Sequence, residues 1–228
     1  MVLSLSQSLN ADTRTEAIRR IEESMATPSP SPRLHLASQS ARRRELLARH
    51  GVEHDAAHPG IDDGQLSPGN VSADQWVASL AYLKAVAGAQ AAKSGPVLGA
   101  DTVCVVDGEM LGQPDDADDA SRMIRLVENR AHEVVTGVAL VWPGEARREI
   151  FVDRAVVSVG QIGEGRINEY IASGQWQGKA GAYNLSERMA AGWPITFSGD
   201  PSTVMGLPMR ALLRRLERIG ATVPPSSG

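Results

Sequence analysis

The sequence predicts an α/β domain, because strand-like and helix-like segments follow one another along the chain. Leu34–Ala37 is a short apolar run, and after a Ser-rich turn residues 42–49 have the pattern of a helix. Val97–Val106 (VLGADTVCVV) is apolar enough for an internal strand, and Asp107-Gly108 then signals a tight hairpin to residues 109–111. At 228 residues with 42% hydrophobic side chains, the chain is long enough for one sizeable domain or two tightly joined lobes.

The other elements follow from the spacing of apolar residues and from turn signals. The clearest helix covers residues 72–92, in which Trp76, Val77, Leu80, Leu83 and Val86 recur at helical spacing. The rest are, in order, a strand at 52–56, a helix at 118–127, strands at 132–141 and 149–159, a helix at 164–172, a glycine-flanked loop at 178–183, a turn and strand at 198–207, and a closing helix at 208–219.

The two ends of the chain differ from the middle. Residues 1–32 are polar, with one possible short helix at 15–23 and a linker-like TPSPSP at 27–32, so a flexible N-terminal extension is expected. Residues 33–220 form the predicted domain, and residues 221–228 a frayed C-terminal tail.

Composition excludes several classes of protein. The net charge of −4 and the 4% aromatic content argue against a nucleic-acid polymer as partner. Cys104 is the single cysteine and lies in an apolar strand, so it is expected in the core, without a disulfide framework. No apolar run is long enough to span a membrane, and the N-terminus lacks the pattern of a signal peptide. A cytoplasmic protein is therefore predicted.

The first turn of the helix at 42–49 carries an unusual charge. Ser40 is a plausible N-cap, and Arg42, Arg43 and Arg44 follow it where the helix dipole already favours negative charge. Backbone N–H groups, Ser hydroxyls and Arg side chains together bind phosphate, so this turn predicts an anion site. The alternative is that the three arginines only face solvent.

Acidic residues mark a second candidate region. Asp101 lies in an apolar strand, where a carboxylate is costly unless it is paired or binds a metal, and Thr102 adds a hydroxyl beside it. Asp62 and Asp63 follow a turn and are either a solvated loop or ligands for a hard divalent cation. Lys84 is either a surface lysine or a phosphate ligand. For Asp101, the alternative to a role in a functional site is a structural one, such as capping a nearby turn.

Seven motifs in sequence order resemble those of the Maf family of nucleotide pyrophosphatases. They cover residues 33–216 and read LASQSARRRELL, IDD, LAYLKA, VLGADTVCVVDGEMLGQP, RAHEVVTGVAL, YIASGQWQGKAGAY and VMGLP. The resemblance implies a mixed α/β fold like that of inosine triphosphatases, with a bent sheet and two lobes around a central cleft, in a homodimer. It also implies hydrolysis of nucleoside triphosphates to monophosphate and pyrophosphate with Mg²⁺ or Mn²⁺, in a house-cleaning or division-linked role.

The resemblance assigns roles to individual residues. Asp101 matches a proton acceptor or metal ligand, and Lys84 and Lys179 match lysines of the cleft. Asp63 stands where the family usually has a glutamate, and Asp62 or Asp63 is the candidate to hold the metal together with Asp101. Ser38, Arg42 and Arg43 match the phosphate-binding turn, to which Ser40 also belongs, while Arg42 and Thr102 match positions that tune base preference.

Two further residues depart from the family pattern. Gln113 stands where the family has a lysine, and Ser186 stands where it has a glutamine tied to base recognition. A glutamine can donate a hydrogen bond but cannot neutralise charge, and a serine cannot make a two-point amide contact. The predicted substrates are dTTP, UTP or modified nucleotides. The alternatives are a catalytically weakened nucleotide-binding regulator of division and an inosine-triphosphate-type pyrophosphatase.

Overall fold

The computed structural model describes residues 16, 19, 33–61, 66–92 and 94–220. The chain divides into two units, Met1–Ser31 and Pro32–Gly228, and the fold below is that of the second unit. The predicted N-terminal extension with its short helix, the acidic pair at 62 and 63, and the C-terminal tail lie outside the described residues, Glu16 and Arg19 aside.

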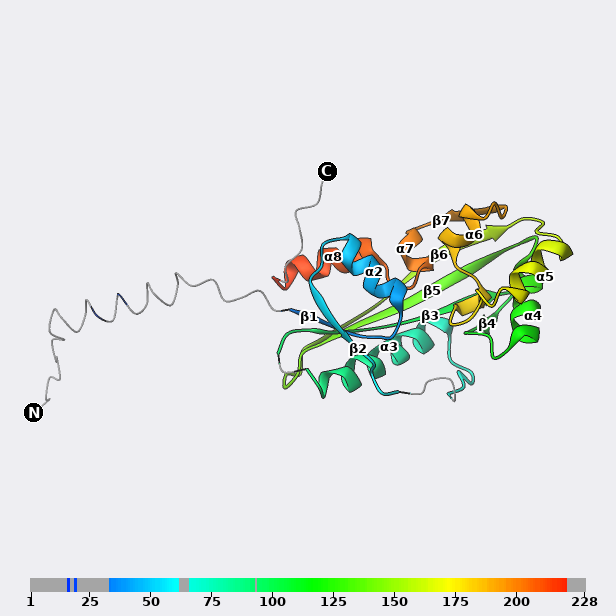
Figure 1. Ribbon diagram of the computed structural model, residues 1–228. Coiled ribbons are helices and arrows are strands. Elements are labelled where there is room, and N and C mark those ends of the chain that lie inside the picture. The colour runs from blue at the N-terminus through cyan, green and yellow to red at the C-terminus, as the bar shows by residue number, and fades with distance from the viewer. Residues whose placement is uncertain (1–15, 17–18, 20–32, 62–65, 93, 221–228) are drawn as a thin grey trace, which may run out of the picture. The chain divides into compact units, whose positions relative to one another are not determined.

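One mixed sheet of seven strands organises this unit, as the sequence predicts (Figure 1). The strand order is β2-β1-β3-β5-β6-β7, with β4 paired to β3 as the second arm of the predicted hairpin. Pairing is parallel between β2, β1 and β3 and antiparallel from β3 onward. The strands are β1 Leu34–Ala37, β2 His54–Ala57, β3 Val97–Val106, β4 Glu109–Leu111, β5 Arg130–Val141, β6 Arg148–Val159 and β7 Ile195–Ser198.

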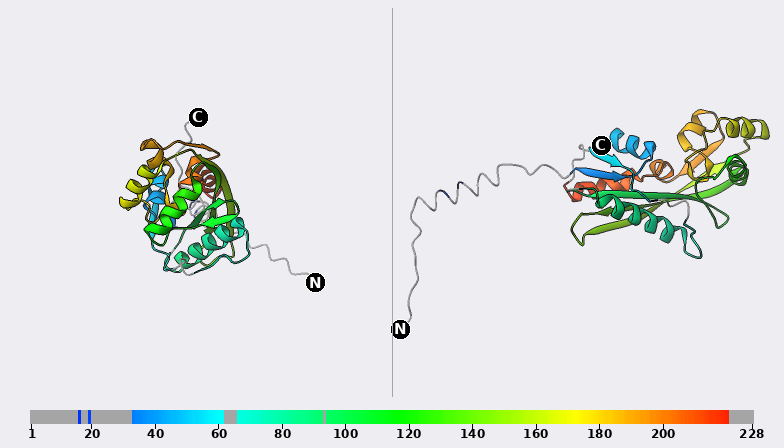
Figure 2. Two further views of the ribbon diagram at one scale, coloured as in Figure 1. Left: turned by 90° about the vertical axis from the view of Figure 1, so that its right-hand side faces the viewer. Right: turned by 60° about the horizontal axis from the view of Figure 1, so that its bottom comes forward.

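Helices cover both faces of the sheet, with α3 on one face and α2 and α8 on the other (Figures 1 and 2). Most begin at a side-chain cap that the sequence contains, such as Ser40 for α2 and the Ser72–Gln75 capping box for α3. They are α2 Ala41–Arg49, α3 Ala73–Ala89, α4 Ala117–Val127, α5 Glu164–Ala172, α6 Leu185–Ala190, α7 Pro201–Val204 and α8 Met209–Arg218, with a 3-10 turn η1 at Ala180–Ala182.

Two apolar clusters lie on the sheet face away from α3 and form the two lobes. The first joins α2 and α8 to β1 and to the start of β3, and it includes Leu47, Leu98 and Leu212. The second joins α4, α5 and α6 to the far end of β3, and it includes Cys104 and Ile124. The long strands β3 and β5 contribute to both clusters, so they hold the lobes in one body.

One prediction about local structure is wrong. Residues 198–207 do not form a turn and strand: β7 ends at Ser198, and α7 follows because Asp200 caps it through Ser202 N (2.9 Å) and proline occupies its first position. Of the residues at apolar spacing on α3, Val77 and Leu80 are buried, whereas Leu83 and Val86 are 45% and 38% exposed.

The buried residues of α3 are Val77, Leu80, Ala81 and Ala85. The helix packs unusually close to the sheet, because a Cβ added to Gly99 would lie 2.1 Å from the Ala81 carbonyl oxygen and one added to Gly137 would lie 2.4 Å from Val77. Only glycine fits at these two strand positions.

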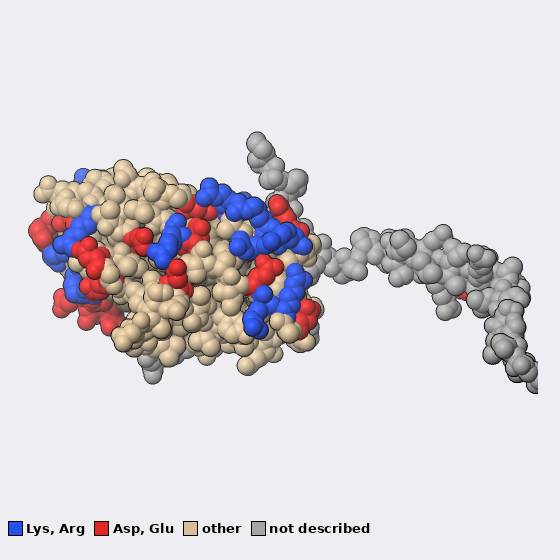
Figure 3. All heavy atoms as spheres, turned by 180° about the vertical axis from the view of Figure 1, so that it is seen from behind, with Lys and Arg blue, Asp and Glu red and all other residues tan. Residues whose placement is uncertain are grey.

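The surface carries charges of both signs. On the face opposite that of Figure 1, basic and acidic side chains are interspersed (Figure 3). Some of the exposed ones pair, as Arg154 does with Asp74 (2.7 Å) and with Glu133 (2.6 Å), but exposed ion pairs contribute little to stability. Within the described ranges, no helix is both long enough and apolar enough to cross a membrane.

Candidate active site

An open cleft lies beside a gap in the sheet along β3. β1 pairs with β3 only at Val97 and Leu98, and β4 pairs only from Cys104 onward. Residues 99–103 therefore have a strand partner on the β5 side alone among the described strands. Asp101 and Thr102 lie in this gap, and both line the cleft. The cleft is open to solvent, and its empty space, open solvent included, is about 620 Å³.

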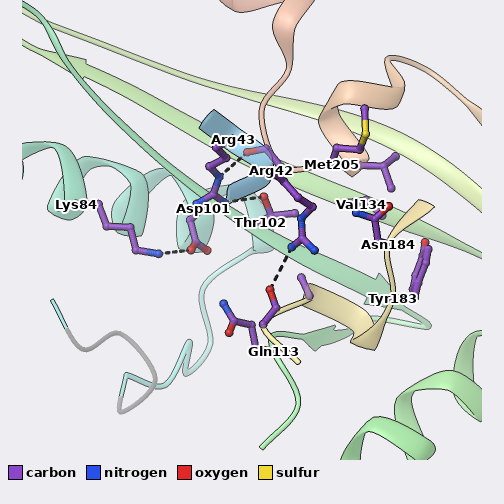
Figure 4. A pocket seen from close by; sticks show the side chains of 14 residues that line it. Arg42, Arg43, Lys84, Asp101, Thr102, Gln113, Val134, Tyr183, Asn184 and Met205 are labelled. Carbon is purple, nitrogen blue, oxygen red and sulfur yellow. Dashed lines mark hydrogen bonds and ion pairs between the residues drawn. The ribbon is translucent and has the colours of Figure 1, made fainter. Parts of the chain in front are cut away.

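A buried ion pair occupies one end of the cleft (Figure 4). Lys84 Nζ lies 2.7 Å from Asp101 Oδ1, and each side chain is 12% exposed. The pair joins α3 to β3, and it forms because Gly99 and Gly137 let α3 approach the sheet closely. Both residues were sequence candidates, and the structure brings them together. An ion pair this deep requires good geometry to offset the cost of removing two charges from water.

Arg43 connects α2 to the turn that follows α7. Its Nε donates to the Gly206 carbonyl (2.8 Å), Nη1 to Ser38 Oγ (3.3 Å) and Nη2 to Thr102 Oγ1 (3.3 Å). Gly206 has φ of +97°, a conformation that favours glycine, and this brings its carbonyl to the guanidinium.

Thr102 continues this network into the sheet. Thr136 Oγ1 donates to the Thr203 carbonyl (2.8 Å), so Thr102 must be the donor in the 3.0 Å contact between the two threonine hydroxyls. Thr102 therefore accepts from Arg43 and donates to Thr136. A side chain held this way is fixed in orientation.

Ser38 and Ser40 shape the turn before α2. Ser40 Oγ accepts from the backbone N–H of Arg43 (3.4 Å), and Ser38 Oγ accepts from the backbone N–H of Ser40 (3.2 Å). Ser38 is 6% exposed, and neither serine belongs to the described lining of the cleft. The N-cap prediction for Ser40 is confirmed.

Arg42 lies on the cleft side of the same turn. Its Nη2 donates to the Gly178 carbonyl (3.1 Å) across the cleft, and Gln113 lines the same wall. Burial lowers the pKa of Arg42, and the negative field of Glu187 partly opposes this shift. Arginine remains a cation despite such shifts, so Arg42 is the cationic side chain in α2 that is best placed to meet an anion.

Lys179 and Ser186 lie outside the described lining of this cleft. Lys179 is 8% exposed and pairs with Glu187, and burial lowers its pKa while the hydrogen bond that its ammonium donates to the Glu187 carboxylate opposes the shift. Ser186 lines an adjoining hollow together with Arg42 and Glu187. Ser186 Oγ donates to Asn184 Oδ1 (2.9 Å).

The far end of the cleft is less polar. Val134, Tyr183, Asn184 and Met205 line it, at a distance from the Lys84–Asp101 pair in the view of Figure 4. His132 Nε2 lies 2.7 Å from the Tyr183 hydroxyl and holds that ring edge-on. Sequence reasoning missed all four lining residues, although VMGLP contains Met205 and is one of the motifs quoted above.

A divalent cation fits the chemistry of the charged end. Asp62 and Asp63 lie outside the described residues, and the residues that are described contain no cluster of three or more metal-binding side chains. Asp101 contributes one carboxylate, of which Lys84 holds one oxygen. Mg²⁺ commonly binds through one or two carboxylates together with substrate phosphates and water, so a single carboxylate suffices for an ion that arrives with its nucleotide.

Comparison with known proteins places this cleft in a family. The family model described as "Maf-like protein" matches residues 33–219. The chain is 38% identical over 202 residues to the dTTP/UTP pyrophosphatase of Bordetella parapertussis, which covers 85% of this chain and 95% of that protein. It is 39% identical over 183 residues to the dTTP/UTP pyrophosphatase of Salinibacter ruber, which covers 80% of this chain and 89% of that one.

A third relative, the dTTP/UTP pyrophosphatase of Pelotomaculum thermopropionicum, is 35% identical over 188 residues, covering 82% of this chain and 97% of the relative. Among solved structures, the Ham1 protein of Staphylococcus aureus overlaps 56% of this chain and 71% of its own, with 12% identity and a TM-score of 0.39. The match over residues 33–219, together with these relatives, shows that the chain belongs to the Maf family.

Proposed function

We propose that this protein hydrolyses nucleoside triphosphates to the monophosphate and pyrophosphate, with dTTP and UTP as the preferred substrates. The observation that carries the proposal is the Lys84–Asp101 pair, which opens on the same cleft as Arg42. A carboxylate that shares a cleft with two cations suits a reaction in which a polyanion must be held while water attacks it. Relatives that share most of the chain are named dTTP/UTP pyrophosphatases.

The chemical step uses residues at the charged end. Arg42 and Lys84 bind the triphosphate and offset its charge. The Asp101 carboxylate, with one oxygen fixed by Lys84, orients a water and accepts its proton as the water oxygen attacks the α-phosphorus. The bond from that phosphorus to the bridging oxygen breaks, and pyrophosphate leaves with the bridging oxygen. When bound, a divalent cation on Asp101 and the phosphates would neutralise further charge.

Product analysis in ¹⁸O-labelled water tests this directly. Attack at the α-phosphorus predicts one ¹⁸O in the nucleoside monophosphate and unlabelled pyrophosphate. Arg42→Ala should raise KM and lower kcat/KM, whereas Arg44→Ala, an exposed neighbour outside the cleft lining, should leave both close to wild type. Release of inorganic phosphate and nucleoside diphosphate instead would refute the proposed bond cleavage.

Two alternatives predict different results in a nucleotide panel. A nucleotide-binding regulator of division, suggested by the uncharged Gln113 in the cleft wall, would bind nucleotides without turning them over. An inosine-triphosphate-type enzyme would release pyrophosphate fastest from deaminated purine nucleotides. Chelation by EDTA should abolish turnover if the divalent cation is required, and added Mg²⁺ or Mn²⁺ should restore it. The homodimer stays a prediction.

A further inference from the structure

Asn184 is a buried amide with half of its hydrogen-bonding capacity unused. It is 6% exposed, precedes α6 as the N-cap, and lines the less polar end of the cleft between Tyr183 and Met205 (Figure 4). It also lines the adjoining hollow that contains Ser186. The side chain therefore lies where the two hollows meet.

The orientation of the amide is fixed by its neighbours. Asn184 Oδ1 accepts from the backbone N–H of Glu187 (3.1 Å) and from Ser186 Oγ (2.9 Å). A backbone N–H can only donate, so the atom that faces it must be the carbonyl oxygen rather than the NH₂ group. Flipping the amide would direct the NH₂ group at a donor and break the cap of α6.

The NH₂ group of Asn184 consequently points away from the Glu187 N–H and the Ser186 hydroxyl. Across the described part of the chain, no protein acceptor makes a hydrogen bond with Asn184 Nδ2. A donor at the wall of a cleft that no protein group accepts from is available to a ligand in that cleft. The neighbouring Val134 and Met205 offer apolar contact to the faces of a flat ring.

We propose that Asn184 Nδ2 reads the nucleotide base by donating to a carbonyl oxygen, with Ser186 as the residue that locks the amide in this orientation. This rests on the proposed function, because it requires a nucleotide with its phosphates at the Lys84–Asp101 end. Uracil and thymine carry a carbonyl at the ring position where cytosine carries an amino group. A fixed N–H donor can form a hydrogen bond with the carbonyl of uracil or thymine, but it faces a second donor in the amino group of cytosine. The cleft therefore selects UTP and dTTP over CTP and dCTP.

The inference also explains how a serine can serve where the family has a glutamine. Ser186 is too short to make a two-point contact with a base, but its hydroxyl holds the neighbouring amide. Ser186 is therefore a positioning residue, and Asn184 makes the contact with the base.

The test is the ratio of kcat/KM for UTP to that for CTP, measured on the full chain. Effects on the triphosphate cancel in this ratio, because both substrates carry the same phosphates. Asn184→Ser keeps an oxygen that can cap α6 but removes the amide donor. It should reduce the UTP preference by about tenfold or more, whereas Asn184→Asp, which replaces the donor by an acceptor, should shift the ratio further towards CTP.

Ser186→Ala is the matched control for the lock. It leaves the amide in place and removes one of its two holders, so the ratio should fall by less than in Asn184→Ser. Thermal unfolding of each variant checks the α6 cap. An unchanged UTP-to-CTP ratio in both folded Asn184 variants would overturn the inference while leaving the pyrophosphatase intact.

Failure of the proposed function has a different signature. In that case the wild-type protein would neither release pyrophosphate from UTP nor bind a non-hydrolysable UTP analogue in titration calorimetry, and the inference would fall with it. If the analogue binds without turnover, the inference is tested by binding instead: the base preference is then the ratio of the dissociation constants of UTP and CTP analogues. A ratio that Asn184→Ser does not change would again overturn it.

Discussion

Arg43 and Arg42 are adjacent in sequence, but the structure predicts opposite consequences for replacing them. In Arg43→Lys, a single nitrogen replaces three that bind Gly206, Ser38 and Thr102. At least two of these hydrogen bonds are lost, and each bond from a charged donor contributes about 1.5–3 kcal/mol. Two of the three are long at 3.3 Å, so we expect a total loss of about 2 kcal/mol in the free energy of unfolding. For a domain of this size that corresponds to a fall of about 4–8 °C in Tm.

Arg42→Lys should behave differently. It loses one hydrogen bond, to Gly178 at the cleft, so the free energy of unfolding should change by less than about 1 kcal/mol while kcat/KM falls. Equilibrium urea unfolding, followed by tryptophan fluorescence, gives the stabilities, with Arg44→Lys as the exposed control. The reasoning is refuted if Arg43→Lys unfolds like wild type yet loses activity, because Arg43 would then act on the substrate and not as a clamp.

Three further predictions concern the packing, the cleft and the core. Gly137→Ala should destabilise the fold by more than about 3 kcal/mol, since the new Cβ meets Val77 backbone at 2.4 Å; wild-type stability in urea would contradict the close approach of α3. Gln113→Lys should raise kcat/KM by about one to two decades by adding a cation to the cleft wall, and a decrease in the same assay would show that the glutamine is itself the better ligand. Burial lowers the pKa of His132 to about 4, so at acidic pH the unfolded chain binds a proton at this histidine more readily than the folded protein does. The free energy of unfolding should therefore fall by on the order of 3 kcal/mol as the pH drops from about 6.5 to 4. His132→Gln should flatten this dependence, and parallel pH profiles for the two proteins would count against it.

Elements that are set by local signals could be predicted from the sequence. The apolar run of β3 with its Asp107-Gly108 turn, and the cap at Ser40, lie where they were expected. The buried face of α3 could be predicted only in part from its apolar spacing, which includes the buried Val77 and Leu80 but also the exposed Leu83. The burial of Ala81 depends on Gly99 in β3, which lets the helix backbone come close to the sheet. The short helix α7 was missed because its cap and proline resemble an ordinary turn.

The candidate site divides in the same way. A carboxylate in an apolar strand, Asp101, indicates by itself that a partner is needed, but the identity of the partner depends on how α3 packs. The roles of Arg42 and Arg43 could not be separated, because the Gly206 carbonyl that engages Arg43 lies 163 residues further along the chain. Asn184 looks like any N-cap in sequence. Only the folded structure shows that Asn184 also lines the cleft.

The most direct test of the account is pyrophosphate release from UTP by wild type and Asp101→Asn under identical conditions with Mg²⁺. Asparagine keeps the shape of the side chain but can neither accept the proton of the attacking water nor hold a cation strongly. We predict a loss of about 100-fold or more in kcat, with UTP binding retained and the variant folded by circular dichroism. Turnover at the wild-type rate in Asp101→Asn would contradict the central claim that this buried carboxylate carries the chemistry.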